Sequence, residues 1–441
     1  MKWFVFAFGL ASTITLAVWL RQNPRQLSKL LTIIGALPLV MGVFPKYQIS
    51  IIGDPGWPGY TQGFDVSIID LVILASYLSL PRGLSARRLP FKLSFVFYLV
   101  AVLISAFQAP NETASFYYVW QLLRMFMVYV VVARACEDTL LTVSLLNGMA
   151  MGLCFQFCIV LWQRFVLHYL HVSGTFIHQN DLGFSANFVI FPFLALLLSG
   201  RKEWQPRVIP VIGITIDIIT ASRAAVAIGG LGFSVFFLLS ILRKRTARKI
   251  RILGAAIMVI VLLSPLAYRQ FELRFNALPL LDFSEEGGRT DLNKTAEMIL
   301  TDHPWGIGAN NFFVVADGQG YYKRANIIAL AADLMPHNLY WLTVAETGYV
   351  GLAALMILLL RPLLFALSCG WHHRTDQRGE LLLGLATSLS IVYIQSYFEW
   401  IFVADYIQYF FAIEIGMIAA LAQQIRFSFN STVSIPQRTF P

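Results

Sequence analysis

Long apolar stretches follow one another along nearly the whole chain, and this feature limits its fold more than any other. Several of them contain roughly 17–22 apolar residues, enough to cross a hydrocarbon core of about 30 Å as a helix. Only 13% of the residues are charged, whereas soluble proteins carry about 25%. Lipid therefore solvates most of the surface. The stretches also lack the apolar–polar alternation of a β-barrel, so the sequence predicts an all-α, polytopic transmembrane bundle.

The hydropathy pattern predicts thirteen spans within one transmembrane domain, residues 1–441. They are 3–20, 30–44, 65–80, 93–108, 116–133, 139–162, 182–199, 208–221, 224–242, 252–268, 338–360, 381–402 and 405–424. If the first run lies only at the periphery, twelve spans remain and nothing else changes. That run is long enough to span and lacks a clear cleavage site, so we expect no cleaved signal peptide.

Basic residues gather in loops that fall on one side of the predicted bundle, and the net charge is +9. The positive-inside rule makes this side cytoplasmic, with the N-terminus outside and the C-terminus inside. These loops are short and separated by spans, which argues against nucleic acid as a partner. The clusters are Arg21/Arg25/Lys29, Arg82/Arg87/Arg88/Lys92, Arg201/Lys202/Arg207, Arg243/Lys244/Arg245/Arg248/Lys249/Arg251 and Arg361/Arg374/Arg378.

The opposite side carries a Gly/Pro/Trp-rich loop, 45–64, and one long loop, 269–337. The long loop exceeds the length of an ordinary connector. Apolar residues recur at helical spacing within 289–301, which predicts a short helix there. His303-Pro304 should end that helix, because proline disfavours the helical conformation in the residue before it.

Several familiar sites are missing from the sequence. It has no Walker A loop, dinucleotide GxGxxG, zinc HExxH or GxSxG elbow. The four cysteines, Cys136, Cys154, Cys158 and Cys369, lie in or beside apolar helices without a histidine to complete a metal set, so we interpret them as packing residues. We therefore expect no cofactor and no metal, and the sequence argues against an ATP-driven protein.

Basic residues on the outer side oppose the usual charge bias and are the first candidates for a site. Arg223 lies between two apolar runs with almost no loop, where a charge is costly unless it is paired or faces water. A guanidinium presents a planar fork of donors suited to phosphate oxygens, which favours an anionic ligand. The alternative is an arginine that reaches the outer headgroups. His303 lies on the same side and is a further candidate for binding.

Arg289 and His337 extend this candidate site. Gly288–Asp291 is expected to open the loop helix, where free N–H groups and the helix dipole would favour an anion beside Arg289. His337 begins the span after the long loop and could act as a general base near neutral pH. Asn338, next to His337, is a further candidate for binding the substrate. The alternatives are an ordinary loop arginine, and a polar helix cap with Asn338 as its N-cap residue.

Other polar residues allow two interpretations. Arg124 lies within a span one turn from Trp120, and Asp217 lies within another span. Such charges either serve a ligand or pair within the bundle. The residues leave this open for Arg124 and favour a structural role for Asp217. His178 and Asn180 belong to a segment rich in side chains able to bond a sugar, although a capping turn explains that segment equally.

Four segments together resemble the bacterial O-antigen ligase and polymerase superfamily. They are GTFIHQND at 174–181, TASRAA at 220–225, GGRTDLNKTAEMILTDHPWGIGANNF at 287–312 and HNLYWLTVAETGYVG at 337–351. The resemblance covers about residues 60–425, and the long outer loop matches too. The chain departs from the family in an additional N-terminal span, which affects the span count and not the site.

The resemblance implies an all-α glycosyltransferase of the bacterial inner membrane. It would move a glycan from undecaprenyl diphosphate to a sugar hydroxyl at the periplasmic face, with another glycan or the lipid A core as acceptor. Carried over, Arg223 and Arg289 would bind the diphosphate and His337 would activate the hydroxyl. His178 and Asn180 would contact the acceptor. A lipid-linked glycan flippase and a structural scaffold are the alternatives, and no repeat typical of transporters is evident.

Overall fold

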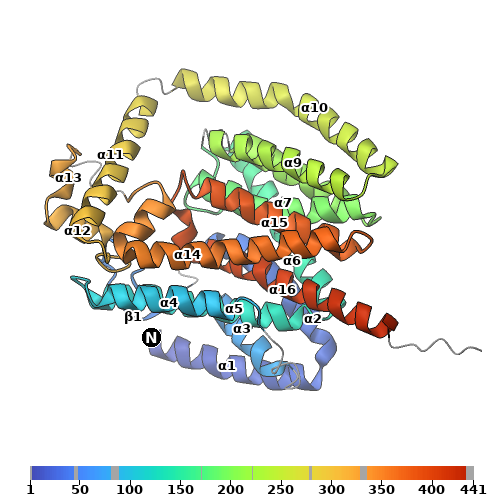
Figure 1. Ribbon diagram of the computed structural model, residues 1–441, viewed down its shortest axis with the longest axis horizontal. Coiled ribbons are helices and arrows are strands. Elements are labelled where there is room, and N and C mark those ends of the chain that lie inside the picture. The colour runs from blue at the N-terminus through green and yellow to red at the C-terminus, as the bar shows by residue number, and fades with distance from the viewer. Residues whose placement is uncertain are drawn as a thin grey trace, which may run out of the picture.

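The computed structural model describes residues 2–43, 48–80, 89–169, 171–220, 222–277, 281–327 and 335–433. Most of these residues form helices that run side by side along the longest axis (Figure 1). Their bounds are α1 (Lys2–Gln22), α2 (Leu27–Val40), α3 (Ile68–Ser79), α4 (Lys92–Ala106), α5 (Glu112–Ala135), α6 (Thr139–Leu161), α7 (Gln179–Ser199), α8 (Gln205–Ile219), α9 (Arg223–Arg243), α10 (Ala247–Ala277), α14 (Leu339–His372), α15 (Gln377–Gln395) and α16 (Asp405–Val433).

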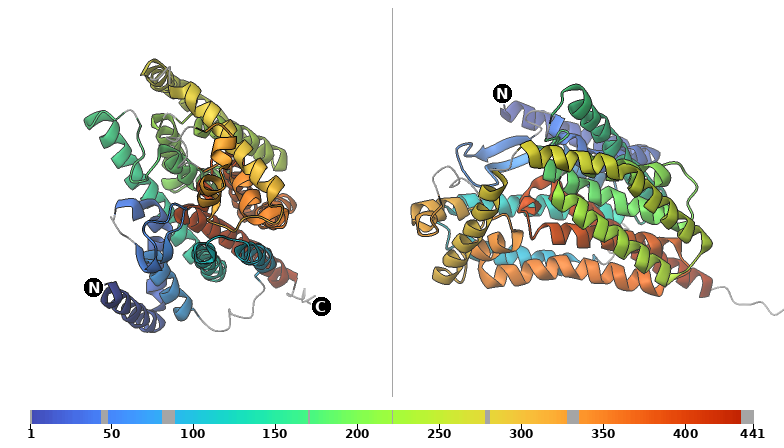
Figure 2. Two further views of the ribbon diagram at one scale, coloured as in Figure 1. Left: turned by 90° about the vertical axis from the view of Figure 1, so that its left-hand side faces the viewer. Right: turned by 90° about the horizontal axis from the view of Figure 1, so that it is seen from above.

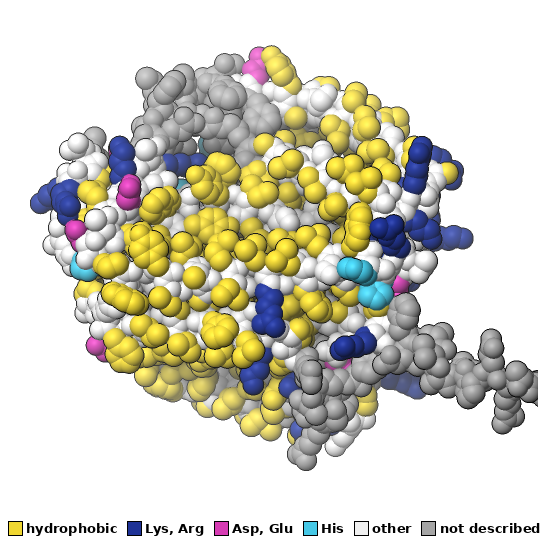
Figure 3. Space-filling model, viewed as in Figure 1, with side chains coloured by type: hydrophobic (Ala, Val, Ile, Leu, Met, Phe, Trp, Pro, Cys, Tyr) yellow, Lys and Arg dark blue, Asp and Glu magenta, His cyan; other side chains and the backbone are white. Residues whose placement is uncertain are grey.

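Each of the thirteen predicted spans overlaps one of these helices, and the all-α membrane bundle is confirmed. Within the described part of the chain, eight helices are long and apolar enough to cross a membrane: α1, α5, α6, α7, α9, α10, α14 and α16. Two shorter apolar helices, α3 and α4, lie beside them. An apolar surface extends between two charged ends (Figure 3). This distribution is expected of a helical bundle whose middle is surrounded by lipid.

Two helix ends and one hairpin differ from the sequence-based expectations. The predicted span 381–402 is not one continuous helix, because α15 ends at Gln395 and a linker, 396–404, which contains a short 3-10 helix (Ile401–Val403), leads to α16. Helix α14 continues past residue 360 to His372. The loop 45–64 contributes to a hairpin of β1 (Gln48–Gly53) and β2 (Gly63–Ser67), paired antiparallel with Ile49 opposite Val66.

The hairpin marks one end of the bundle, which we call the outer end. The same end carries α11 (Leu281–Asp302), α12 (Phe312–Gly318) and α13 (Tyr321–Arg324), as Figure 1 and the right-hand view of Figure 2 show. The loop helix is therefore confirmed, and it ends before His303-Pro304 as predicted. Its apolar residues Leu292, Ala296, Ile299 and Leu300 are buried.

The predicted basic clusters lie at the other end of the helices, which we call the basic end. Arg243 closes α9 there, and its Nη1 lies 2.5 Å from Oε2 of Glu380 on α15. Lys249 of α10 binds the same carboxylate at 3.0 Å. All three side chains are buried, so the cluster fixes the ends of α9, α10 and α15 together. Arg82, Arg87 and Arg88 lie outside the described residues.

A break in α14 fastens the outer loop to the bundle. Gly348 has φ +67°, which releases the carbonyls of the preceding turn. The N–H of Ile307 donates to the Ala345 carbonyl at 3.2 Å, and that of Gly308 to the Glu346 carbonyl at 2.8 Å. The Glu346 carboxylate also accepts from the Tyr60 hydroxyl at 2.7 Å. The loop after α11 is thus held against the first turns of α14.

Candidate active site

The carboxylate of Glu399 brings together three of the residues singled out in the sequence. Its Oε2 lies 3.0 Å from Nδ1 of His337. Its Oε1 accepts from Nδ2 of Asn180 at 2.6 Å and lies 3.4 Å from Nη2 of Arg289. Glu399 is 7% exposed, whereas the side chains of His337 and Arg289 are 24% and 39% exposed. A buried anion therefore organises a histidine and an arginine that solvent reaches.

The linker 396–404 positions Glu399 against the start of α14. The N–H of Leu339 donates to the carbonyl of Ser396 at 2.9 Å, which ties the two segments together. Asn338 caps α14, because its Oδ1 accepts from the N–H groups of Tyr340 and Trp341. His337 directly precedes this cap. Asn338 thus fills the capping role considered in the sequence, and its carboxamide oxygen holds the backbone that carries His337.

Helices α7 and α9 begin at the same place. His178 is the N-cap of α7, with Nδ1 accepting from the N–H of Asn180 at 3.2 Å. The Oδ1 of Asn180 accepts from the hydroxyl of Ser222 at 3.0 Å. Ser222 caps α9, whose first residue is Arg223. The backbone of Arg223 is therefore two hydrogen bonds from Glu399, while its side chain lies outside the described residues.

Arg289 reaches the site from a position that the sequence did not predict. Helix α11 begins at Leu281, so Gly288–Asp291 lies inside the helix and not at its start. The proposed anion site at a helix N-terminus is therefore wrong, because the N–H groups of these residues lie within the helical ladder. The guanidinium itself remains beside Glu399, and its exposed donors are available to an anionic group.

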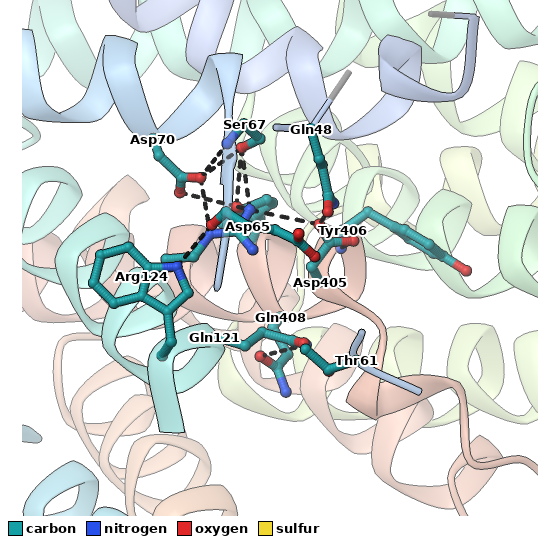
Figure 4. A network of polar contacts seen from close by, with 12 residues as sticks. Gln48, Thr61, Asp65, Ser67, Asp70, Gln121, Arg124, Asp405, Tyr406 and Gln408 are labelled. Carbon is teal, nitrogen blue, oxygen red and sulfur yellow. Dashed lines mark hydrogen bonds and ion pairs between the residues drawn. The ribbon is translucent and has the colours of Figure 1, made fainter. Parts of the chain in front are cut away.

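Arg124 belongs to a separate, buried network between β2, α3, α5 and α16 (Figure 4). Its Nε lies 2.8 Å from Oδ2 of Asp70, and its Nη2 lies 3.7 Å from Oδ2 of Asp405. The same Nη2 donates to the hydroxyls of Ser67, at 3.2 Å, and Tyr409. Two carboxylates and two hydroxyls satisfy this guanidinium, which favours the structural interpretation that the sequence left open.

Two other predicted residues also lie apart from the Glu399 cluster. The Nε2 of His303 is 3.4 Å from Oε1 of Gln319 in the loop after α11. Asp217 is buried in the last turn of α8, and among the described residues its carboxylate makes no ion pair and its Oδ1 has no hydrogen-bond partner.

Glu399 was missed because residues 381–402 were interpreted as one apolar span. A signal existed, since an acidic residue inside such a span is costly and indicates a functional or paired group. The residue ends a short run, 395–399, in which Gln395, Ser396 and Glu399 interrupt the apolar pattern between two helices. That run could have indicated a linker before Asp405.

The arrangement is suited to proton transfer next to an anion-binding group. A carboxylate at Nδ1 favours the tautomer with the proton on that nitrogen, which leaves Nε2 as a proton acceptor. The carboxylate would also stabilise the imidazolium once it forms. Among the described residues, no group of three or more histidines, cysteines or acidic residues could hold a metal ion.

One comparison with known proteins bears directly on this cluster. A family model described as O-Antigen ligase matches residues 208–356, a stretch that includes Arg223, Arg289 and His337. The match supports the resemblance of this stretch to the O-antigen ligase and polymerase superfamily. The chain is a multi-pass bacterial membrane protein, and the family indicates a membrane glycosyltransferase of the O-antigen ligase type. No curated protein matches the chain. Asn180 and Glu399 lie outside the matched stretch, so their place in the site comes from the structure.

Proposed function

We propose that this protein transfers a glycan from undecaprenyl diphosphate to a sugar hydroxyl at the periplasmic face of the inner membrane. The observation that carries the proposal is the Glu399 carboxylate, which is shared by His337 at 3.0 Å and Arg289 at 3.4 Å. Glycosyl transfer from a diphosphate needs a base for the acceptor hydroxyl and a cation for the leaving group. His337 and Arg289 would supply these beside one carboxylate. The acceptor is either another lipid-linked glycan or the lipid A core.

The reaction makes one bond and breaks one bond. The acceptor oxygen bonds to the anomeric carbon, the bond from that carbon to the diphosphate oxygen breaks, and undecaprenyl diphosphate leaves. Nε2 of His337 takes the hydroxyl proton as general base. Glu399 orients the imidazole through Nδ1 and balances the charge that the ring gains.

Arginines supply the charge that the leaving diphosphate requires. Arg289 offers its exposed guanidinium donors, and bidentate contacts between arginine and phosphate are among the strong hydrogen bonds in proteins. Arg223 begins α9 beside Ser222, so we assign it the second contact to the diphosphate. These two cations would stabilise the growing negative charge without a metal. His178 and Asn180, at the start of α7, are proposed to face the acceptor.

The direct test is transfer by the purified protein. A fluorescently labelled glycan on undecaprenyl diphosphate is supplied with each acceptor in turn, and the product is resolved on a gel. We expect transfer to one acceptor and loss of transfer in His337→Ala. The matched control is His303→Ala, since His303 lies on the same loop side but outside the Glu399 cluster.

The outcome also separates the alternatives. Equal activity of His337→Ala and wild type would overturn the proposal in favour of a scaffold. Translocation of the labelled lipid across liposomes that contain only this protein, without any transfer, would indicate a flippase. Transfer to a second lipid-linked glycan identifies a polymerase, and transfer to lipid A core identifies a ligase.

A further inference from the structure

A cavity of about 600 Å³ opens at the basic end, at the opposite end of the bundle from Glu399. Its walls are the first turns of α6 and α15, the last turns of α7, the linker between α7 and α8, and α16. This volume falls within the range of about 300–1,000 Å³ that is usual for small-molecule sites. Nothing in the proposed glycan transfer uses it.

The lining changes from polar to apolar with depth along the helices. Arg201 and Glu203 come from the α7–α8 linker, and Asp376 and Arg378 come from the start of α15. The apolar lining residues lie further from the basic end on the same or neighbouring helices, as the helix directions require: Leu146, Phe193, Leu381 and Leu421. A ligand that fits has a charged head and an apolar continuation, as a membrane lipid does.

The charges at the rim occur in opposite pairs. Arg201 Nη1 lies 3.4 Å from Glu203 Oε1. Arg378 binds Asp376, with Nη2 at 2.6 Å from Oδ2. Glu203 is half exposed, and Arg201 makes only this one long contact to a carboxylate among the described residues, so both have capacity for a ligand. A purely anionic head would meet the two carboxylates, and a purely cationic head the two arginines. A zwitterion satisfies both.

Gln424 adds a requirement for a hydrogen-bond donor. Its Nε2 donates to the carbonyl of Cys136 at 2.7 Å and to the hydroxyl of Thr142 at 3.3 Å. Its Oε1 has no partner although the residue is only 8% exposed and lines the cavity. A buried acceptor without a donor is costly. A primary ammonium carries N–H donors that could satisfy it, whereas a quaternary ammonium carries none.

We propose that this cavity binds the head of phosphatidylethanolamine, with the phosphate at Arg201 and the primary ammonium at Glu203 and Gln424. The acyl region continues along Leu146 and Phe193. The apolar residues deeper in the cavity favour a lipid over soluble phosphoethanolamine. The need for an N–H donor favours an ethanolamine head over a choline head.

The test is native mass spectrometry of the full-length protein released from bilayers with equal parts of phosphatidylethanolamine, phosphatidylcholine and phosphatidylglycerol. We expect retained phosphatidylethanolamine to exceed each competitor about tenfold, the effect of one hydrogen bond to a charged group. Arg201→Gln should lower the retention of all three lipids, because each carries the phosphate, and Glu203→Gln should abolish the preference. The matched controls are Arg207→Gln, on α8 but outside the cavity, and Glu297→Gln, at the outer end; both should keep it.

Three results would overturn the proposal. They are equal retention of the three lipids by the wild type, an unchanged preference in Glu203→Gln together with unchanged retention in Arg201→Gln, and full displacement of the lipid by soluble phosphoethanolamine. Thermal unfolding of each variant checks that it is folded. The binding measurement uses no glycan, so it stands or falls independently of the proposed transfer reaction.

Discussion

Replacing Glu399 with glutamine keeps the size of the side chain and removes its negative charge. The amide oxygen can keep one of the two contacts, which lie at 3.0 Å to Nδ1 of His337 and 2.6 Å to Nδ2 of Asn180, and the amide NH2 then faces the other donor. The variant therefore removes the charge and one hydrogen-bond acceptor, and Asn180→Ala measures the loss of a hydrogen bond alone. In the proposed reaction this charge matters most when His337 has taken the proton, because the imidazolium and the carboxylate then form an ion pair.

The structure sets the size of the effect. Opposite unit charges about 4 Å apart attract by about 4 kcal/mol at an effective dielectric constant of 20. Arg289 lies 3.4 Å from the same carboxylate and neutralises part of its charge. Each 1.36 kcal/mol corresponds to about a tenfold change in rate, so we expect kcat to fall by about 10²–10³.

The assay is the steady-state rate of transfer from the labelled lipid-linked donor, measured over a range of donor concentrations. The KM for the donor should stay the same or fall, because glutamine no longer competes with the diphosphate for Arg289. Asn180→Ala is the companion variant, since it removes one hydrogen bond from Glu399 and leaves the charge. It should lower kcat less than Glu399→Gln does.

The reasoning fails if folded Glu399→Gln retains a kcat within about threefold of wild type, or if only KM rises. The first result would mean that no imidazolium forms beside this carboxylate. The second would mean that Glu399 orders the donor site and not the base. Thermal unfolding of both variants shows whether each is folded.

Three further variants and one control test separate parts of the structure. Arg289→Ala should lower kcat/KM for the donor by about 10²–10³, as the loss of a donor to a developing anion does, whereas Arg324→Ala on the same loop should leave transfer within about threefold because its ion pair is exposed. Gly348→Ala should cost at least about 2 kcal/mol of stability, seen as a lower unfolding midpoint, because the residue has φ +67° and a β-carbon would lie 2.5 Å from the outer-loop backbone. Asp70→Asn should destabilise by about 3 kcal/mol by weakening the buried pair with Arg124; transfer per folded molecule should not change, and a fall in that quantity would assign Arg124 to the site.

The helices were predictable because lipid imposes a simple rule on the sequence. A backbone in hydrocarbon has to satisfy its own hydrogen bonds, so each apolar run became a helix. Two helix ends were also predicted correctly, since α8 and α9 are separated around Ser222 and α11 ends before Pro304. The errors in the prediction concern where individual helices begin and end. Helix α11 starts at Leu281, although its first turns are polar and carry little apolar periodicity.

The centre of the site was not predictable in the same way, because it depends on contacts between distant segments. Glu399 is 62 residues from His337, 110 from Arg289 and 219 from Asn180. Each of those three residues carried a local signal, a helix start or a basic residue on the outer side. Glu399 carried a weaker one, and a hydropathy window absorbed it into a span. Among the residues assigned to the site, the one with the weakest local signal makes the most contacts, since a buried carboxylate stays ionised only where cations and donors surround it. An acidic residue within an apolar run near a span end therefore indicates that partners from other helices meet there.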